Sequence, residues 1–361
     1  MVVAALLVVA ALALLRPSDG AAGVPSDFVG VYADDVFYGT PAYRKRTLRR
    51  QQEAGVRLIR QPFLWQLIER RRGRFNWSSY DNFVLDSASR GIRILPVLVD
   101  PPAFRSRRRS SVGAQRALMY PPRHNRDYAR FAAAAVKRYG NRGTLWAEHQ
   151  DFPKLPIRSW QVWNEPNIKA WWASGPNPRS YVRLLRAAAR AIRRADPSAE
   201  VVAAGIPDSR SGIPFARYVD GMYRAGARGT FDTFAVHPYA RSVDGVFAII
   251  KRARSLMRRH GDRRLPLWVT EVGWATGGRR SPLVVDRSGQ AARIRVAIGR
   301  LAARRRSLRI RGFVYFRWRD ADPLLGRGNP WPPHAGLLHT NGRDKPSFDA
   351  FRRAVRPLSK R

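Results

Sequence analysis

The stretch from residue 158 to residue 205 contains a strand, a helix and a second strand in succession. It begins with the run Arg158-Ser-Trp-Gln-Val-Trp163 and ends with Glu200-Val-Val-Ala-Ala-Gly205. Between them, residues 178–195 carry leucine, alanine and isoleucine on one helical face and an arginine every three or four positions on the other; Asp196-Pro197 ends the pattern. An apolar strand, an amphipathic helix and a further strand form the repeating unit of a parallel α/β sheet.

The same unit repeats along the chain from residue 28. The predicted strands are Phe28–Ala33, Val56–Gln61, Ile92–Val99, Arg158–Trp163, Glu200–Gly205, Thr233–Pro238, Pro266–Thr270 and Gly312–Trp318. The predicted helices cover residues 41–54, 78–90, 125–139, 178–195, 214–226, 244–260, 288–306 and 346–356. Eight strands, each followed by a helix, predict an α/β fold with a single (β/α)8 TIM barrel over residues 24–361. A doubly wound open sheet is the alternative, but no G-x-G-x-x-G motif follows the first strand.

The N-terminal segment predicts export. Val2 to Leu15 is an unbroken apolar run, followed by Arg16-Pro17 and small residues up to Gly23. The run is shorter than the roughly 20 residues that span a bilayer, and it suits the core of a signal peptide. No basic residue precedes the run, which leaves two alternatives, a start codon placed too late or an uncleaved anchor. We therefore expect residues 1–23 to be a signal peptide or N-terminal anchor of a secreted or cell-surface protein.

The net charge is strongly positive. Of 361 residues, 67 are lysine or arginine and 26 are aspartate or glutamate, which gives +41. This predicts weak, salt-dependent attraction to anionic cell surfaces. The arginines fall on every predicted helix and outnumber the lysines by 60 to 7, so compositional bias explains most of the excess, and we expect no specific nucleic-acid partner. Arg105-Ser-Arg-Arg-Arg109, after the third strand, is the one cluster singled out for recognition of an acidic sugar.

The composition also excludes several classes of protein. An apolar content of 45% is too high for a disordered polybasic chain. The absence of cysteine excludes a disulfide scaffold, a thiolate zinc site, an iron–sulfur cluster and a cysteine nucleophile. Five histidines show no metal-ligand spacing, so we expect neither a metal nor a cofactor: His124, His149, His260, His334 and His339.

Glutamate is scarce, with six in the chain, and two of the six follow predicted strands that face each other. Glu165 ends the fourth strand and Glu271 ends the seventh, each beside tryptophan. In a barrel the carboxyl ends of the strands carry the chemistry. Two carboxylates across such a mouth are the minimum apparatus for cleaving a glycosidic bond, one protonated as the acid and one ionised. The alternative for each glutamate is a helix cap or a surface charge.

Two motifs around these glutamates resemble the signatures of clan A of the glycoside hydrolases, the retaining (β/α)8 enzymes. They are Trp163-Asn-Glu-Pro166 and Thr270-Glu-Val-Gly-Trp274. Supporting likeness to family 39 and its neighbours comes from Gly55-Val-Arg-Leu-Ile-Arg60 and Gly73-Arg-Phe-Asn-Trp77. Many family 5 members have a histidine after the third strand, where this chain has Asp100-Pro-Pro102, so the likeness favours family 39.

The resemblance implies a role for each matching residue. Glu165 would be the acid/base and Glu271 the nucleophile. Asn164 would hold the 2-hydroxyl of the sugar, and Arg60 would hydrogen-bond Glu271 and keep it ionised. His237 or Tyr239 would be the other support of the nucleophile, and Trp318 would form the floor under the sugar.

The predicted activity is therefore retaining hydrolysis of O-glycosidic bonds, mainly β-linked, in an oligo- or polysaccharide. Two alternatives stay open: a barrel that binds carbohydrate without cleaving it, and a polyanion-binding protein. Five tryptophans could stack on sugars, namely Trp65, Trp171, Trp172, Trp274 and Trp331, and we expect two of them to face a cleft. The sugar, the linkage, exo or endo action and the oligomeric state leave no signal in the sequence.

Overall fold

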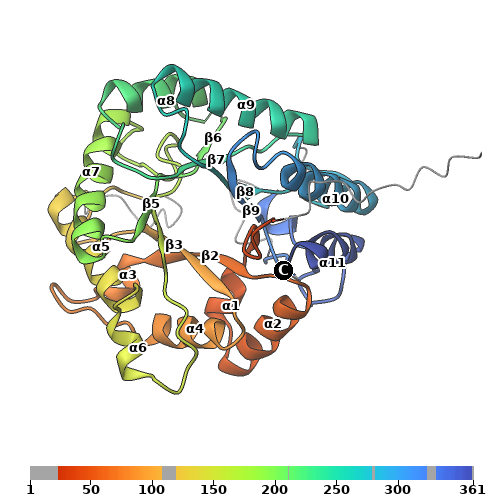
Figure 1. Ribbon diagram of the computed structural model, residues 1–361, viewed down its shortest axis with the longest axis horizontal. Helices are drawn as coiled ribbons and strands as arrows, with labels where there is room; N and C mark the ends of the chain where they lie inside the picture. Colours follow the sequence, from red (N-terminus) through yellow and green to blue (C-terminus); the bar gives the residue numbers. More distant parts are fainter. Residues whose placement is uncertain (1–22, 108–118, 210, 279–280, 323–330, 360–361) are drawn as a thin grey trace, which may run out of the picture.

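A curled sheet of parallel strands forms the centre of the fold, and helices surround it (Figure 1). The computed structural model describes residues 23–107, 119–209, 211–278, 281–322 and 331–359. Within them, nine strands lie in the order β5-β4-β3-β2-β1-β9-β8-β7-β6, and all neighbours are parallel. The strands are β1 (Val29–Tyr32), β2 (Leu58–Leu64), β3 (Arg93–Val99), β4 (Ser159–Val162), β5 (Glu200–Val202), β6 (Ile206–Pro207), β7 (Phe234–His237), β8 (Leu267–Val272) and β9 (Ile310–Tyr315). The predicted α/β fold is confirmed.

The two end strands of this sheet come from one short segment of the chain. β5 and β6 are separated by only three residues, 203–205. Val202 forms a parallel bridge with Thr233, and the Ala203 amide donates to the Thr233 carbonyl at 3.0 Å. Thr233 directly precedes β7, so the curl brings the fifth predicted strand next to the sixth.

Helices follow the strands and cover the outside of the sheet (Figure 1). The eight predicted helices correspond to α2 (Pro41–Glu53), α4 (Ser78–Ala88), α5 (Asn125–Tyr139), α7 (Pro178–Ala195), α8 (Phe215–Arg224), α9 (Val243–Arg259), α10 (Arg287–Ala303) and α11 (Pro346–Ser359). The structure adds α1 (Asp34–Tyr38), α3 (Trp65–Ile68), α6 (Thr144–Glu148) and a 3-10 turn at Pro332–His334. These elements are too short to display a helical period in the sequence.

Helix α7 shows why the chain folds into this unit. The Asn177 side chain accepts a hydrogen bond from the Ser180 amide at 2.9 Å, and Pro178 occupies the first turn, where its missing amide costs nothing. Its leucine, alanine and isoleucine face is buried against the sheet. Each large apolar side chain buried in this way contributes about 1.5–3 kcal/mol.

The last strand ends earlier than predicted. β9 covers Ile310–Tyr315, whereas the sequence predicted Gly312–Trp318. Residues 316–318 therefore lie beyond the strand, and the Trp318 amide turns back to the Tyr32 carbonyl at 2.8 Å. This difference decides which aromatic side chain faces the site described below.

The N-terminal apolar run, Val2–Leu15, lies outside the described residues. Across the described ranges, none of the helices combines the length and apolar character needed to cross a membrane.

Candidate active site

A cavity of about 220 Å³ opens at the carboxyl ends of the strands. Five of the seven residues predicted for the site line it: Arg60, Asn164, Glu165, Tyr239 and Glu271. They come from β2, from the loop after β4, from the loop after β7 and from β8. The other two, His237 and Trp318, are fully buried behind the lining.

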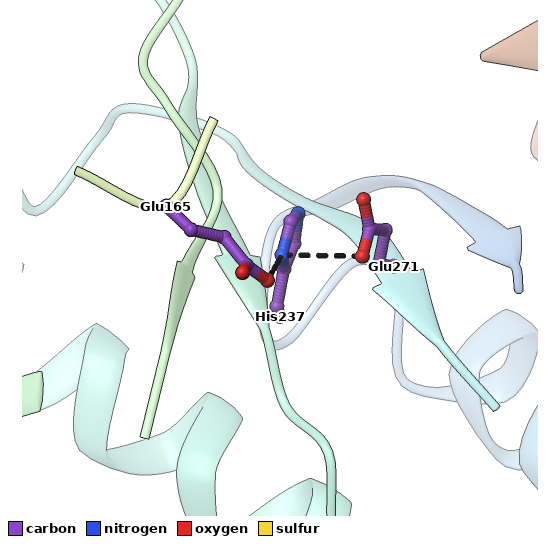
Figure 2. A group of neighbouring side chains, drawn as sticks. All are labelled: Glu165, His237 and Glu271. Carbon is purple, nitrogen blue, oxygen red and sulfur yellow. Dashed lines mark hydrogen bonds and ion pairs between the residues drawn. The ribbon is translucent and has the colours of Figure 1, made fainter. Parts of the chain in front are cut away.

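Glu165, His237 and Glu271 form one cluster, with the imidazole between the two carboxylates (Figure 2). The Nδ1 atom of His237 is 2.7 Å from Oε1 of Glu165 and 3.5 Å from Oε2 of Glu271. One oxygen of each carboxylate and a ring nitrogen all lie within 4.8 Å of one another. The structure thus brings Glu165 and Glu271 together, from strands that the sequence predicted to face each other.

Arg60 holds the Glu271 carboxylate in place by a hydrogen bond. Its Nη1 donates to Oε1 of Glu271, its Nη2 to Oδ1 of Asn164 at 2.8 Å, and its Nε to Oε1 of Gln161 at 2.8 Å. The guanidinium is buried, so these three acceptors fix its position. Tyr239 holds the same carboxylate from the other side, because its hydroxyl donates to Oε2 at 2.8 Å. Tyr239 and Arg60 are thus the direct partners of Glu271, and His237 is the direct partner of Glu165.

The two carboxylates have opposite electrostatic surroundings. Burial acts to raise the pKa of Glu271, but His237, the Arg60 charge and the hydrogen bonds from Tyr239 and Arg60 outweigh it and lower that pKa. Burial also acts on Glu165, and there it prevails over the hydrogen bond from His237 and raises the pKa. Glu271 is therefore held as a carboxylate while Glu165 tends to keep its proton.

A chain of hydrogen bonds joins the two sides beneath the cavity. Gln161, fully buried in β4, accepts from Arg60 and donates to Oγ1 of Thr270 at 3.3 Å; Thr270 in turn is 3.0 Å from Nε2 of His237. Sequence reasoning did not single out Gln161. The signal was present, since it is the polar residue inside the otherwise apolar run Trp160-Gln-Val-Trp163.

Room for His237 depends on Gly205, in the gap between β5 and β6. A Cβ atom at position 205 would lie 2.0 Å from Nε2 of His237, closer than atoms can approach. Any side chain there would displace the imidazole from Glu165.

The backbone that carries Glu165 is strained. Trp163 has a φ of 72° and Glu165 a φ of 41°, the left-handed region that residues other than glycine enter at a cost of about 1–3 kcal/mol each. Surrounding bonds offset this cost: the Trp163 indole donates to the Trp171 carbonyl at 2.7 Å, and the Glu165 amide donates to the Gly205 carbonyl at 3.1 Å. Such strain is concentrated at functional sites in proteins.

Aromatic side chains form the walls of the cavity. Of the five tryptophans considered from sequence, Trp171 and Trp331 line it, while Trp65, Trp172 and Trp274 are buried in the core. Trp331 contacts Tyr239 edge-on, with ring centroids 5.1 Å apart.

The predicted position of Trp318 is wrong. Trp318 is fully buried and packs edge-on against Phe348, with ring centroids 5.7 Å apart. Because β9 ends at Tyr315, the aromatic ring that reaches the cavity is that of Phe316, two residues earlier.

The basic cluster after the third strand does not present a free arginine at position 105. Arg105 is buried and bonded to Glu69 at 2.8 Å and to Asp127 at 3.1 Å. The charge of Arg105 is therefore neutralised by two acids of the protein, and the prediction that Arg105 recognises an acidic sugar is wrong. Arg108 and Arg109 lie outside the described residues.

Glu165, His237 and Glu271 are also the described residues that could together hold a metal ion. The Arg60 guanidinium already brings a fixed positive charge to Glu271, which disfavours a second cation on the same carboxylate. The arrangement is better suited to one carboxyl group that carries a proton beside one that stays ionised than to ligating a metal.

Solved structures that this chain resembles are glycoside hydrolases of families 39 and 5. A family 39 glycoside hydrolase from Bacteroides cellulosilyticus WH2 has a TM-score of 0.64 and 21% identity, over 93% of this chain and 64% of that one. A monomeric beta-xylosidase from Caulobacter crescentus CB15 has a TM-score of 0.63 and 18% identity, over 90% of this chain and 67% of that one. A GH5_18 protein from Streptomyces cattleya, in complex with GlcNAc, has a TM-score of 0.65 and 16% identity, over 93% of this chain and 81% of that one.

These likenesses confirm the resemblance to families 39 and 5 at the level of the fold. The chain spans less than two thirds of the length of the family 39 enzyme. No family model and no curated protein sequence matches the chain.

Proposed function

We propose that this chain is a retaining glycoside hydrolase that cleaves β-linked O-glycosidic bonds by double displacement. The observation that carries the proposal is the pair of Glu165 and Glu271, with carboxylate oxygens within 4.8 Å and pKa values shifted in opposite directions. Retaining glycosidases have their two carboxyl groups about 5–5.5 Å apart, whereas inverting enzymes need about 6.5–9.5 Å to admit a water molecule between them. The short separation supports the retaining reaction.

In the first step, Glu271 attacks the anomeric carbon and Glu165 gives its proton to the leaving oxygen. The bond between the anomeric carbon and that oxygen breaks, and a glycosyl ester of Glu271 forms. The raised pKa of Glu165 keeps the proton available, and the lowered pKa of Glu271 keeps the nucleophile ionised.

In the second step, the ionised Glu165 takes a proton from water as the water oxygen attacks the anomeric carbon. The ester bond breaks, Glu271 leaves as a carboxylate, and the sugar is released with its original anomeric configuration. Arg60 and Tyr239 stabilise the carboxylate that is regenerated.

The cavity suits one sugar ring above Glu271. At about 220 Å³ it is smaller than the roughly 300–1,000 Å³ of pockets that hold drug-sized ligands. Oδ1 of Asn164 accepts from Arg60, which leaves the Nδ2 donor of this cavity-lining amide for a sugar hydroxyl. Phe316, Trp171 and Trp331 offer apolar ring faces to the C–H groups of a sugar.

We further infer that β5 and β6 are two parts of one strand, so that the sheet is an eight-stranded barrel. The bridge from Val202 to Thr233 supports this, because it links the segment before the gap to the segment that leads into β7. Hydrogen exchange tests this inference. We expect the Ala203 amide, which bonds to Thr233, to be protected from exchange as strongly as the amides of β7.

We also infer that the protein is exported. This inference rests only on the N-terminal apolar run from Val2 to Leu15. Expression of the full chain in an export-competent host, followed by N-terminal sequencing of the protein in the medium, tests this. Protein retained in the cytoplasm with residue 1 or 2 at its N-terminus would contradict it.

The reaction is tested on a panel of aryl β-glycosides, with the matching aryl α-glycosides as the stereochemical control. We expect hydrolysis of at least one β-glycoside, with the β-anomer appearing first in the NMR spectrum. A 2-deoxy-2-fluoro aryl glycoside should add the mass of one sugar to the peptide that contains Glu271. First release of the inverted anomer, or a label on another residue, would overturn the mechanism; binding of the same glycosides without hydrolysis would instead support a non-catalytic carbohydrate-binding protein.

A further inference from the structure

Helices α5 and α7 lie side by side on the outside of the sheet (Figure 1). A second concave site lies between them. This α5–α7 groove has a volume of about 490 Å³ and is lined from α5 by Arg126, Arg130 and Lys137 and from α7 by Arg190 and Arg194, over a floor of alanines. We propose that the groove binds a single chain of an acidic polysaccharide. The proposal rests on the groove alone and does not depend on the reaction proposed above.

Four of the five positive charges in the groove have no acidic partner among the described residues. Its lining contains five cationic side chains and no acidic one. Within the described part of the chain, only Arg130 has a carboxylate partner, Asp127 at 2.5 Å, and Asp127 is itself buried and shared with Arg105. A groove with this excess attracts and concentrates anions, because its walls focus the field of the charges that line it.

Some other arginines on the outer helices are paired with acids. Arg193, on the neighbouring face of α7, bonds Asp232 at 2.8 Å, and Arg300 on α10 bonds Asp244 at 2.7 Å. Exposed arginines without a carboxylate partner among the described residues also occur elsewhere on the outer helices, for example Arg217 and Arg295, in line with the even spread expected from the sequence. The α5–α7 groove differs because five cations line one concavity whose described lining contains no acidic residue.

The shape of the groove favours an extended chain. Arg126 and Lys137 are eleven positions apart on α5, which corresponds to roughly 16 Å along the helix axis. The alanines, which include Ala129 and Ala191, present only methyl groups, so sugar C–H groups can lie on them while acidic substituents reach the cations of both helices. Arginine donors match the geometry of a carboxylate or sulfate, which they can bind with two parallel hydrogen bonds.

Nucleic acid and membrane fit the groove less well. Proteins that bind single-stranded nucleic acid stack the bases on aromatic side chains, and no aromatic residue is among those that line the groove in the described chain. A membrane surface is flat on this scale and would not fill a concavity between two helices. A carbohydrate chain with acidic groups needs neither stacking nor a flat surface.

The test compares two variants with the same loss of charge. The groove variant is R126Q/K137Q/R190Q/R194Q, which leaves the Arg130–Asp127 ion pair intact. The control variant, R217Q/R224Q/R295Q/R353Q, removes four exposed arginines from α8, α10 and α11. Binding of each full chain to polygalacturonate is measured in 150 mM salt, with neutral cellulose oligosaccharides, a dT20 oligonucleotide and vesicles rich in phosphatidylserine as the other probes. Circular dichroism and thermal unfolding check that both variants are folded.

We expect the groove variant to bind polygalacturonate at least about tenfold more weakly than the wild type, and the control variant to bind within about twofold of it. An equal loss in both variants would overturn the proposal in favour of general charge. Absence of wild-type binding would also overturn it. Groove-dependent binding that is tighter for the oligonucleotide or the vesicles than for polygalacturonate would assign the groove to that other class of partner and refute this one.

Discussion

Arg60 in the cavity and Arg190 in the α5–α7 groove carry the same guanidinium group in contrasting surroundings. Arg60 is 1% exposed and its donors are taken by Glu271, Asn164 and Gln161. Arg190 is exposed, and no carboxylate of the described chain pairs with it. A buried arginine whose three nitrogens all bond to the protein sets the charge of its neighbours, whereas an exposed arginine without a carboxylate partner is available to a ligand. The five predictions that follow test the cavity side of this comparison, the group of residues around Arg60, in order of decreasing effect.

The largest effect is expected from Glu271→Gln. It removes the proposed nucleophile and leaves the Arg60 charge buried without its counter-ion, so kcat on an aryl β-glycoside should fall by at least about 10⁴-fold. The matched control is Glu53→Gln, the same change at an exposed glutamate that lies 4.0 Å from Arg49. Activity within tenfold of the wild type for Glu271→Gln would remove Glu271 from the reaction.

Glu165→Gln should have the next largest effect, because it removes the proton donor but keeps the nucleophile. We expect kcat/KM, which reports the first step, to fall by about 10²–10⁴-fold for poor leaving groups and by much less for an activated aryl group that needs no proton. Rates measured across a series of leaving groups check this. A uniform loss across the series would argue against the acid role of Glu165.

The wild-type pH profile of kcat/KM should be bell-shaped. Activity should rise on the acid side as Glu271, whose pKa is lowered, ionises, and fall on the alkaline side as Glu165, whose pKa is raised, loses its proton. Glu165→Gln should lose the alkaline limb and keep the acid limb. Loss of the acid limb in that variant would exchange the two assignments.

Tyr239→Phe removes one hydrogen bond from Glu271 and should lower kcat/KM by about 10–100-fold, the range for a bond to a charged group. Because that bond lowers the pKa of Glu271, its loss should move the acid limb to higher pH. The control is Tyr38→Phe, a change at an exposed tyrosine. A rate loss with no shift of the acid limb would indicate that Tyr239 acts on the substrate instead of on Glu271.

Gln161→Met keeps the volume but breaks the hydrogen-bond chain beneath the cavity. It leaves Nε of Arg60 and the Ala203 carbonyl without this partner, so the free energy of unfolding should fall by about 1–3 kcal/mol. Denaturant unfolding measures the loss, and the pH profile gives a readout that stability alone would not move. An unchanged profile and unchanged stability would show that the chain of bonds does not couple the two carboxylates.

The sequence was sufficient to predict the positions of Glu165 and Glu271, because glutamate is scarce and both residues follow apolar strands. It was not sufficient for Trp318. The run from residue 312 to 318 stays rich in apolar and aromatic residues beyond Tyr315, so its hydrophobic pattern does not mark where hydrogen bonding to the neighbouring strand ends. The side chain that reaches a cavity depends on that end point, and Phe316 was missed for this reason.

Which arginines are free to bind a ligand could not be predicted for a related reason. A list of arginines shows where cations lie along the chain, but pairing with acids is decided by contacts between distant segments. Arg105 looked available and is buried on Glu69 and Asp127. Arg190 looked like one of many surface charges and lies in a groove without an acid.

The gap between β5 and β6 limits how this scaffold could be redesigned. Residues 203–205 supply the carbonyl that Gln161 bonds and the empty space that His237 occupies. A mutant library that varies this segment would therefore produce mostly inactive clones, whatever the intended change of substrate. Trp171 and Trp331 contact the cavity without taking part in the hydrogen bonds of Glu165 or Glu271, so directed evolution of substrate preference should begin with those two positions.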